Sequence, residues 1–204
     1  LLRSCDGVIA LNERAAELYT PKATRLILDG AADCDANADA GLGIPTPKTD
    51  DPKRVVFTGA LVEYNGIREL IDAMDYVRTE GVVLDLYGAG PLAGLAADAA
   101  LSSPRIHYHG SVCSDSIGSI QKQAFLLINP RRPHDPISEL TFPSKVLEYM
   151  LTGVPVLSTR LNGFSPAYEG KLVFLESGSA QSIAQAIDEL AALPSKELVE
   201  IGAR

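Results

Sequence analysis

From residue 54 onward, short and entirely apolar segments alternate with segments of helical spacing. Strands that are apolar on both faces belong to parallel sheets that helices cover on both sides. We therefore expect an α/β fold, a Rossmann-like, doubly wound parallel sheet. The predicted strands cover residues 55–57, 82–87, 105–109, 124–128, 154–158 and 171–175, and the helices between them cover residues 67–77, 115–123, 142–151 and 181–190.

The beginning of the chain differs from this regular part. Residues 7–11 have the pattern of a buried strand, and Asn12 is a suitable N-cap for a helix that starts at residue 13. Residues 29–52 are rich in Asp, Ala, Gly and Pro without periodicity, which is typical of a linker. The chain starts without Met and stops inside a helical pattern, so we expect a fragment of a larger protein.

Composition excludes several classes of function. The formal net charge of −8 disfavours a nucleic-acid partner, although a small phosphorylated ligand needs only local amides and a few cations. No apolar run approaches the roughly 20 residues of a membrane-spanning helix. The three cysteines are widely and irregularly spaced, which favours reduced thiols in a cytoplasmic protein over a disulfide framework or a zinc knuckle.

Ligands of doubly wound sheets bind outside the carboxyl ends of the strands. Gly88 and Gly90 follow a predicted strand and let the backbone approach a ligand closely. They lack the third glycine of a dinucleotide fingerprint, so a tight turn without a ligand explains them equally well. The loops at this edge are residues 58–66, 88–91, 110–114, 129–144 and 158–165.

The segment from Phe142 to Met150 is more informative, because a helix begins there at the ligand-binding edge. Its free N–H groups and positive dipole end favour an anion such as a diphosphate. The dipole disfavours Lys145 in the first turn, and a bound anion would account for it. Glu148 lies on the same face, where its carboxylate can accept hydrogen bonds from ribose hydroxyls. The alternative is an exposed Lys145–Glu148 ion pair on a surface helix.

The histidines do not predict a metal site. His107 and His109 alternate onto one face of a strand, and His134 lies in a loop. No third ligand has a convincing spacing, so we expect no metal.

The segment Phe142-Pro143-Ser144-Lys145-Val146-Leu147-Glu148, continued by Tyr149-Met150 and Gly153-Val154-Pro155-Val156, resembles the signature of the group 1, family 4 retaining glycosyltransferases. Residues 56–61, 65–67, 86–91 and 107–110 match other segments of that family in the right order. Residues 6–12 resemble the last strand of its N-terminal domain. The resemblance covers nearly the whole chain.

This resemblance implies the C-terminal half of a GT-B fold, the half that binds the nucleotide-sugar donor. Residues 1–30 would be the end of the N-terminal, acceptor-binding domain and the crossover, residues 31–53 a linker, and residues 54–204 the donor domain. The enzyme would transfer a sugar from a nucleotide diphosphate to a glycan, lipid or small-molecule acceptor, with retention and without a metal or other cofactor. The fragment alone would be inactive, and the full-length protein could associate peripherally with a membrane.

The resemblance also implies roles for individual residues. Glu148 would hold the ribose, and Val112 would meet the base. The N–H groups around Phe142, Ser144 and Lys145 would face the diphosphate. The glycines that would border the nucleotide are Gly59, Gly88 and Gly90.

Two departures from the family pattern affect the chemistry. The first glutamate of the family's glutamate pair falls on Leu140, and Glu139, one residue earlier, is the candidate catalytic residue if a shifted loop lets it reach the donor sugar. The family's usual phosphate-binding Arg and Lys match Ala60 and Asn65. A subgroup in bacterial polysaccharide assembly has Asn-Pro-Arg and Phe-Pro-Ser-Lys segments instead, so we expect Lys145 and Arg131, with Arg132 as a further candidate, to supply the positive charge.

Two other functions remain open. A nucleotide-binding module that has lost its chemistry would account for Leu140, Ala60 and Asn65. A GT-B sugar-nucleotide epimerase shares the two-domain layout, but its characteristic His-Arg-Glu motif is absent from the sequence.

Overall fold

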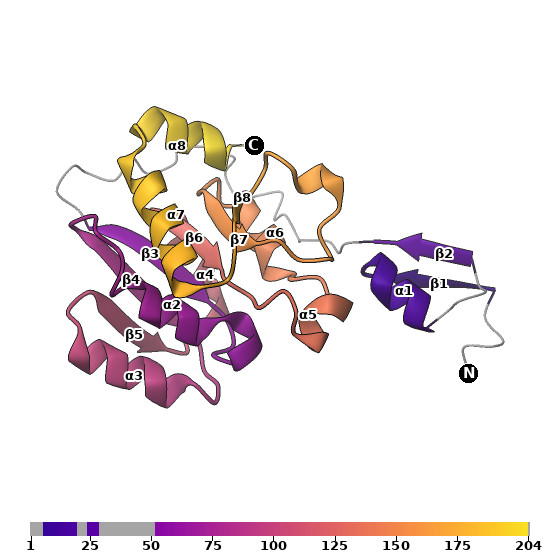
Figure 1. The fold of residues 1–204 in the computed structure, drawn as a ribbon, viewed down its shortest axis with the longest axis horizontal. Helices are drawn as coiled ribbons and strands as arrows, with labels where there is room; N and C mark the ends of the chain where they lie inside the picture. Colours follow the sequence, from indigo (N-terminus) through magenta and orange to yellow (C-terminus); the bar gives the residue numbers. More distant parts are fainter. Residues whose placement is uncertain (1–5, 20–23, 29–51, 204) are drawn as a thin grey trace.

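The computed structural model describes residues 6–19, 24–28 and 52–203, and its main body is one parallel sheet covered by helices (Figure 1). The strand order β5-β4-β3-β6-β7-β8 places the first strand of this body at the centre, beside the fourth. That order and the parallel pairing confirm the predicted doubly wound, Rossmann-like α/β fold. The strands are β3 (Lys53–Thr58), β4 (Val82–Tyr87), β5 (Ile106–Gly110), β6 (Leu126–Asn129), β7 (Val156–Thr159) and β8 (Val173–Leu175).

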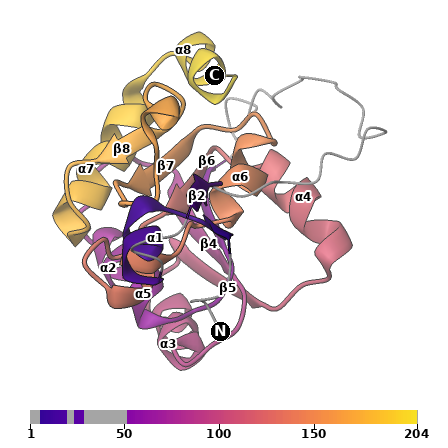
Figure 2. The ribbon, with the colours of Figure 1, turned by 90° about the vertical axis from the view of Figure 1, so that its right-hand side faces the viewer.

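Helices cover both faces of the sheet, α2 and α7 on one side and α4 and α6 on the other (Figure 2). Alternate residues of each strand supply the two faces, so Phe57 packs beneath α2 whereas Val56 packs beneath α6. The helices of the main body are η2 (Glu63–Asn65), α2 (Ile67–Ala73), α3 (Ala93–Ser102), α4 (Ser114–Lys122), α5 (Pro136–Leu140), α6 (Lys145–Met150), η3 (Pro166–Tyr168), α7 (Ala180–Ala192) and α8 (Ser195–Gly202).

Two boundaries at the carboxyl edge of the sheet differ from the sequence prediction. The predicted loop 129–144 contains the short helix α5, whose N-cap Asp135 accepts a hydrogen bond from the Ile137 N–H at 2.9 Å. Pro136 occupies the first helical position, where its missing N–H costs nothing. The helix predicted to begin at residue 142 begins instead at Lys145, the first residue of α6.

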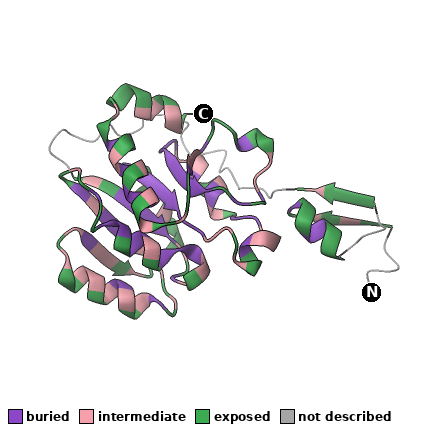
Figure 3. Ribbon diagram, viewed as in Figure 1, coloured by how far each residue is buried: buried purple, intermediate pink, exposed green. Residues whose placement is uncertain are grey.

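A separate small unit lies at the start of the chain. Strands β1 (Gly7–Ala10) and β2 (Thr24–Ile27) pair in parallel, with α1 (Glu13–Tyr19) between them. The Asn12 side chain accepts a hydrogen bond from the Ala15 N–H at 2.8 Å, which confirms the predicted N-cap. Most of the unit is exposed, in contrast to the buried strands of the main body (Figure 3). The predicted linker at residues 31–53 lies almost wholly outside the described residues.

Every helix in the described ranges is too short or too polar to span a lipid bilayer.

Candidate functional site

The carboxyl ends of the central strands carry buried polar residues. Thr58 ends β3, Asn129 ends β6, and Ser158 and Thr159 end β7. After β3 the chain continues to α2, which covers one face of the sheet. After β6 it continues through α5 to α6, which covers the opposite face. This divergence between adjacent strands is the topological switch point, where sheets of this kind bind ligands.

Lys145 provides the most unusual group at this point. Its Nζ atom lies 4.0 Å from the centre of the Phe57 ring and is inaccessible to solvent, although the residue as a whole is partly exposed. This amine has no hydrogen-bond partner among the described residues. Burial, assisted by the positive charge of Arg131, lowers the pKa of Lys145 to about 7, and only Glu148 opposes the shift.

Arg131 is a second buried cation beside the first. Its guanidinium donates hydrogen bonds from Nε to Ser138 Oγ at 2.9 Å and from Nη2 to Thr141 Oγ1 at 2.7 Å. The group also lies 5.1 Å from the centre of the Tyr64 ring. In the part of the chain that the structure describes, no carboxylate pairs with it. Burial therefore lowers the pKa of Arg131 below its usual range.

Tyr149 connects α6 to the end of β3, a function that the sequence did not predict. Its buried hydroxyl accepts a hydrogen bond from the Thr58 N–H at 2.9 Å and lies 3.2 Å from the Thr58 carbonyl oxygen, to which it donates. Lys145 and Tyr149 are four residues apart, so both face the end of β3 from one side of α6. The four-residue spacing of Lys145 and Tyr149 was the feature of the sequence from which the position of Tyr149 could have been predicted.

Gly88 and Gly59 bring two loops of the site into direct contact. A Cβ atom on Gly88 would lie 1.8 Å from the Gly59 carbonyl oxygen, and the φ of Gly88 is +140°. A Cβ atom on Gly59 would lie 2.8 Å from Lys145 Nζ. At Gly90 a Cβ atom would lie 2.4 Å from the Leu61 carbonyl oxygen. Packing between the loops therefore requires these glycines, and their contact with a nucleotide stays a prediction.

The residues at the start of α6 are arranged differently from the sequence-based expectation. The Ser144 N–H donates to the Phe142 carbonyl oxygen at 3.0 Å, so it is not free for a ligand in this conformation. The Phe142 side chain packs against Phe164 and Tyr168 in a cluster of aromatic rings. Glu148 is exposed on α6 and forms no ion pair with Lys145, so the alternative of a surface Lys145–Glu148 pair is wrong.

The remaining candidates lie on neighbouring segments. Glu139 is partly exposed on α5, next to Ser138, the buried residue that binds Arg131. Val112 is half-buried in the loop after β5. Arg132 does not provide a free cation, because its guanidinium pairs with Glu63 at 3.0 Å and with Glu69 at 2.7 Å. Glu63 also forms an ion pair with Arg68 at 2.9 Å.

Several solved structures share the fold of this chain. The chain superimposes on the Anabaena protein HepE, crystallised with UDP and glucose, with a TM-score of 0.72 at 16% identity, covering 98% of this chain and 57% of that one. A Rickettsia africae glycosyltransferase gives 0.70 at 16% identity, covering 97% and 57%. Sucrose-phosphate synthase of Thermosynechococcus elongatus gives 0.70 at 20% identity, covering 98% and 52%. The chain thus spans little more than half the length of these proteins.

The shared fold is that of the C-terminal half of GT-B proteins. Residues 52–192 match the family model described as "Glycosyl transferases group 1", and the chain belongs to that family. No curated protein sequence matches the chain.

Proposed function

We propose that residues 54–204 form the donor-binding domain of a retaining glycosyltransferase. In this proposal the diphosphate of a nucleotide sugar binds at the carboxyl ends of β3 and β6, and Lys145 and Arg131 neutralise its charge. The observation that carries the proposal is the Lys145 amine, which is buried and has no hydrogen-bond partner among the residues that the structure describes. A buried amine without a hydrogen bond destabilises the folded chain, and a phosphate oxygen would supply the missing acceptor.

Arg131 strengthens this assignment. Its positive charge contributes to the lowered pKa of Lys145, so the two cations repel each other in the ligand-free chain. No described carboxylate pairs with either of them. Strongly shifted pKa values at such an edge are typical of functional sites, and a ligand with two or more negative charges suits this one. HepE, which shares the fold, was crystallised with UDP.

The other residues take roles around the diphosphate. Glu148, exposed on α6, binds the ribose hydroxyls, and Val112 contacts the base. Glu139 on α5 reaches the donor sugar if α5 shifts. The backbone around Phe142 and Ser144 faces the diphosphate after the turn at Ser144 rearranges, and the backbone of Gly59, Gly88 and Gly90 borders the nucleotide.

The acceptor belongs to the other half of the protein. The unit of β1, α1 and β2 supports this division, because Ile9 and Leu26 are 65% and 54% exposed. An isolated two-stranded sheet is only marginally stable, so these side chains need further strands or helices to cover them. The full protein is a cytoplasmic enzyme of polysaccharide assembly that associates with the membrane periphery.

A nucleotide-binding module without catalysis is the second candidate. Position 140, where the family has a glutamate, is Leu140 on α5, and Glu139 beside it lies about 100° around the helix. This candidate shares the nucleotide site and differs only in turnover.

Nucleotide binding to the chain tests the proposal directly. We expect one of UDP, GDP and ADP to raise the melting temperature, and a ligand at 100 times its dissociation constant to stabilise the fold by about 2.7 kcal/mol. Lys145→Met should remove most of this stabilisation, whereas Lys171→Met, at an exposed position, should not change it. Equal stabilisation of both variants, or none of the wild type by any nucleotide, would overturn the assignment.

Turnover by the full-length protein separates the two candidates. A transferase releases nucleoside diphosphate from a nucleotide sugar when the acceptor is present. A module without catalysis binds the same nucleotide but releases no product.

A further inference from the structure

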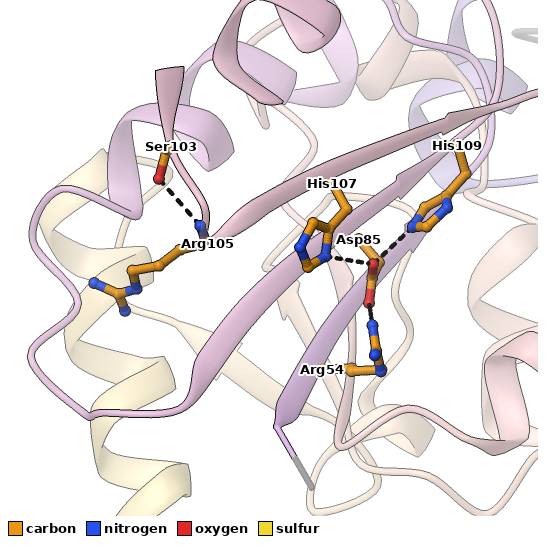
Figure 4. Close-up of polar contacts among 6 residues, drawn as sticks. All are labelled: Arg54, Asp85, Ser103, Arg105, His107 and His109. Atoms are coloured by element: carbon orange, nitrogen blue, oxygen red, sulfur yellow. Dashed lines mark hydrogen bonds and ion pairs between the residues drawn. The ribbon is translucent and has the colours of Figure 1, made fainter. Parts of the chain in front are cut away.

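Asp85, His107 and His109 converge on the edge strand β5 and its neighbour β4 (Figure 4). Asp85 lies on β4 and pairs in register with His107 on β5. Its Oδ1 atom lies 3.1 Å from His107 Nδ1 and 2.7 Å from His109 Nε2. Both rings therefore point one nitrogen at the same carboxylate oxygen.

We propose that Asp85, His107 and His109 form a binding site for a divalent transition-metal ion of the zinc type. Two imidazole nitrogens and a carboxylate oxygen are ligands that Zn²⁺ accepts, with a water as the fourth. The three ligand atoms lie within 4.8 Å of one another. Tetrahedral coordination separates neighbouring ligand atoms by about 3.3 Å, which is close to the 3.1 and 2.7 Å between Asp85 Oδ1 and the two ring nitrogens, and rotation of the rings would bring the nitrogens to that distance from each other.

To bind the ion, each neutral ring would hold its single proton on the nitrogen that faces away from Oδ1, so that the nitrogen near Oδ1 offers its lone pair. A ring that now donates to Oδ1 would move its proton to the other nitrogen through water, and Asp85 would bind as the carboxylate. His107 and His109 have side chains that are 40% and 36% exposed, so an ion and its water can reach them.

Surrounding residues hold the ligands in place. Arg54 Nη1 donates to the second carboxylate oxygen of Asp85 at 2.9 Å, which leaves Oδ1 for the ion. The Tyr87 ring stacks on His109 with centres 4.3 Å apart and planes 7° apart. Such outer contacts fix ligand orientation, and two paired strands provide a rigid base. An ion bound here would fasten β5 to β4 next to Gly88.

The sequence did not predict this site because the third ligand is distant along the chain. Asp85 precedes His107 by 22 residues and is brought to it by strand pairing. The expectation of no metal relied on spacing alone, which does not show strand register.

Calorimetry with Zn²⁺ and the visible absorption of bound Co²⁺ test the inference, using the chain without nucleotide. We expect one ion to bind at this site, with affinity lowered roughly tenfold or more in His107→Gln and in Asp85→Asn. His134→Gln and Cys113→Ser change exposed groups outside the cluster and should bind as the wild type does.

A melting experiment without metal checks that His107→Gln is folded, as expected for a half-exposed side chain. In the folded variant Zn²⁺ should raise the melting temperature less than it does in the wild type. No binding to the wild type, or equal affinity in wild type and His107→Gln, would refute the site. The result does not depend on the nucleotide proposal, since the two sites share no residue.

Discussion

The Tyr149 hydroxyl and the Thr58 backbone are hydrogen-bonded across 91 residues of sequence, at 2.9 Å from the Thr58 N–H to the hydroxyl oxygen. Tyr149 is fully buried, and burial raises its pKa to about 12, so the hydroxyl remains protonated. Gln121 Nε2 donates to the Thr58 hydroxyl at 3.1 Å and completes the network. This network sets the position of α6, and therefore of Lys145, relative to the end of β3.

Tyr149→Phe removes the hydroxyl and leaves the Thr58 N–H buried without a partner. We expect the free energy of unfolding to fall by about 1–3 kcal/mol, measured by urea denaturation. Tyr76→Phe, at a half-exposed tyrosine, should change it by less than about 0.5 kcal/mol. Equal stability of the two variants would mean that the Tyr149 network does not support α6.

Lys145→Met should have opposite effects on binding and on stability. Nucleotide-diphosphate affinity should weaken by about 1.5–3 kcal/mol, the range for a hydrogen bond to a charged group. The ligand-free chain should become more stable at pH 7, because a buried amine without a partner is replaced by an apolar side chain. Calorimetry and urea denaturation measure the two effects, and loss of both together would indicate misfolding instead.

The lowered pKa of Lys145 makes stability depend on pH in one particular window. The folded chain has a pKa of about 7 at this group, against the ordinary value of 10.5. Between these values the unfolded chain binds a proton that the folded chain does not, so the free energy of unfolding rises with pH there. The slope should approach about 1.4 kcal/mol per pH unit and vanish outside the window. Urea denaturation at a series of pH values measures this dependence, and subtracting the values for Lys145→Met isolates the contribution of the amine. Identical pH dependence in the wild type and the variant would show that the Lys145 amine is not buried.

Diphosphate binding should be coupled to proton uptake. An anion beside Lys145 favours the charged amine and raises its pKa, so binding just above pH 7 takes up a proton and affinity falls as pH increases. Calorimetry in two buffers of different ionisation enthalpy measures the uptake. Lys145→Met, compared at the same pH, cancels the protonation of the phosphate itself and should show less uptake.

Gly88→Ala tests the contact between the two loops. The new Cβ would lie 1.8 Å from the Gly59 carbonyl oxygen, so the loops must separate, and we expect destabilisation by more than about 2 kcal/mol. Gly94→Ala is the matched control, because Gly94 lies in α3 with nothing within 4 Å of an added Cβ. That change should stabilise the chain by about 0.5–1 kcal/mol through helix propensity. A tolerated Gly88→Ala would show that the loop contact is not required.

Local patterns were sufficient for the class of fold and for the edge where a ligand would bind. Strand β6 is apolar on both faces from Leu126 to Ile128 because helices cover both, and this is visible in the sequence itself. The Asn12 cap was predictable for the same reason, since its bond to Ala15 spans one helical turn. The first residue of α6 was not predictable from the sequence, because the Ser144 N–H donates a hydrogen bond to the Phe142 carbonyl oxygen in a turn that precedes the helix.

Tertiary structure decided everything that depends on which segments meet. Lys145 and Glu148 share a short helix, and the sequence alone allowed an exposed pair; packing against Phe57 and Gly59 instead buries the amine. Strand register likewise brought Asp85 to His107, and loop packing accounted for Gly88. The spacing of apolar residues along the sequence indicates whether a segment forms a helix or a strand and which of its faces is buried. Desolvation of a charge depends on atoms contributed from distant parts of the chain, and only the folded arrangement brings those atoms together.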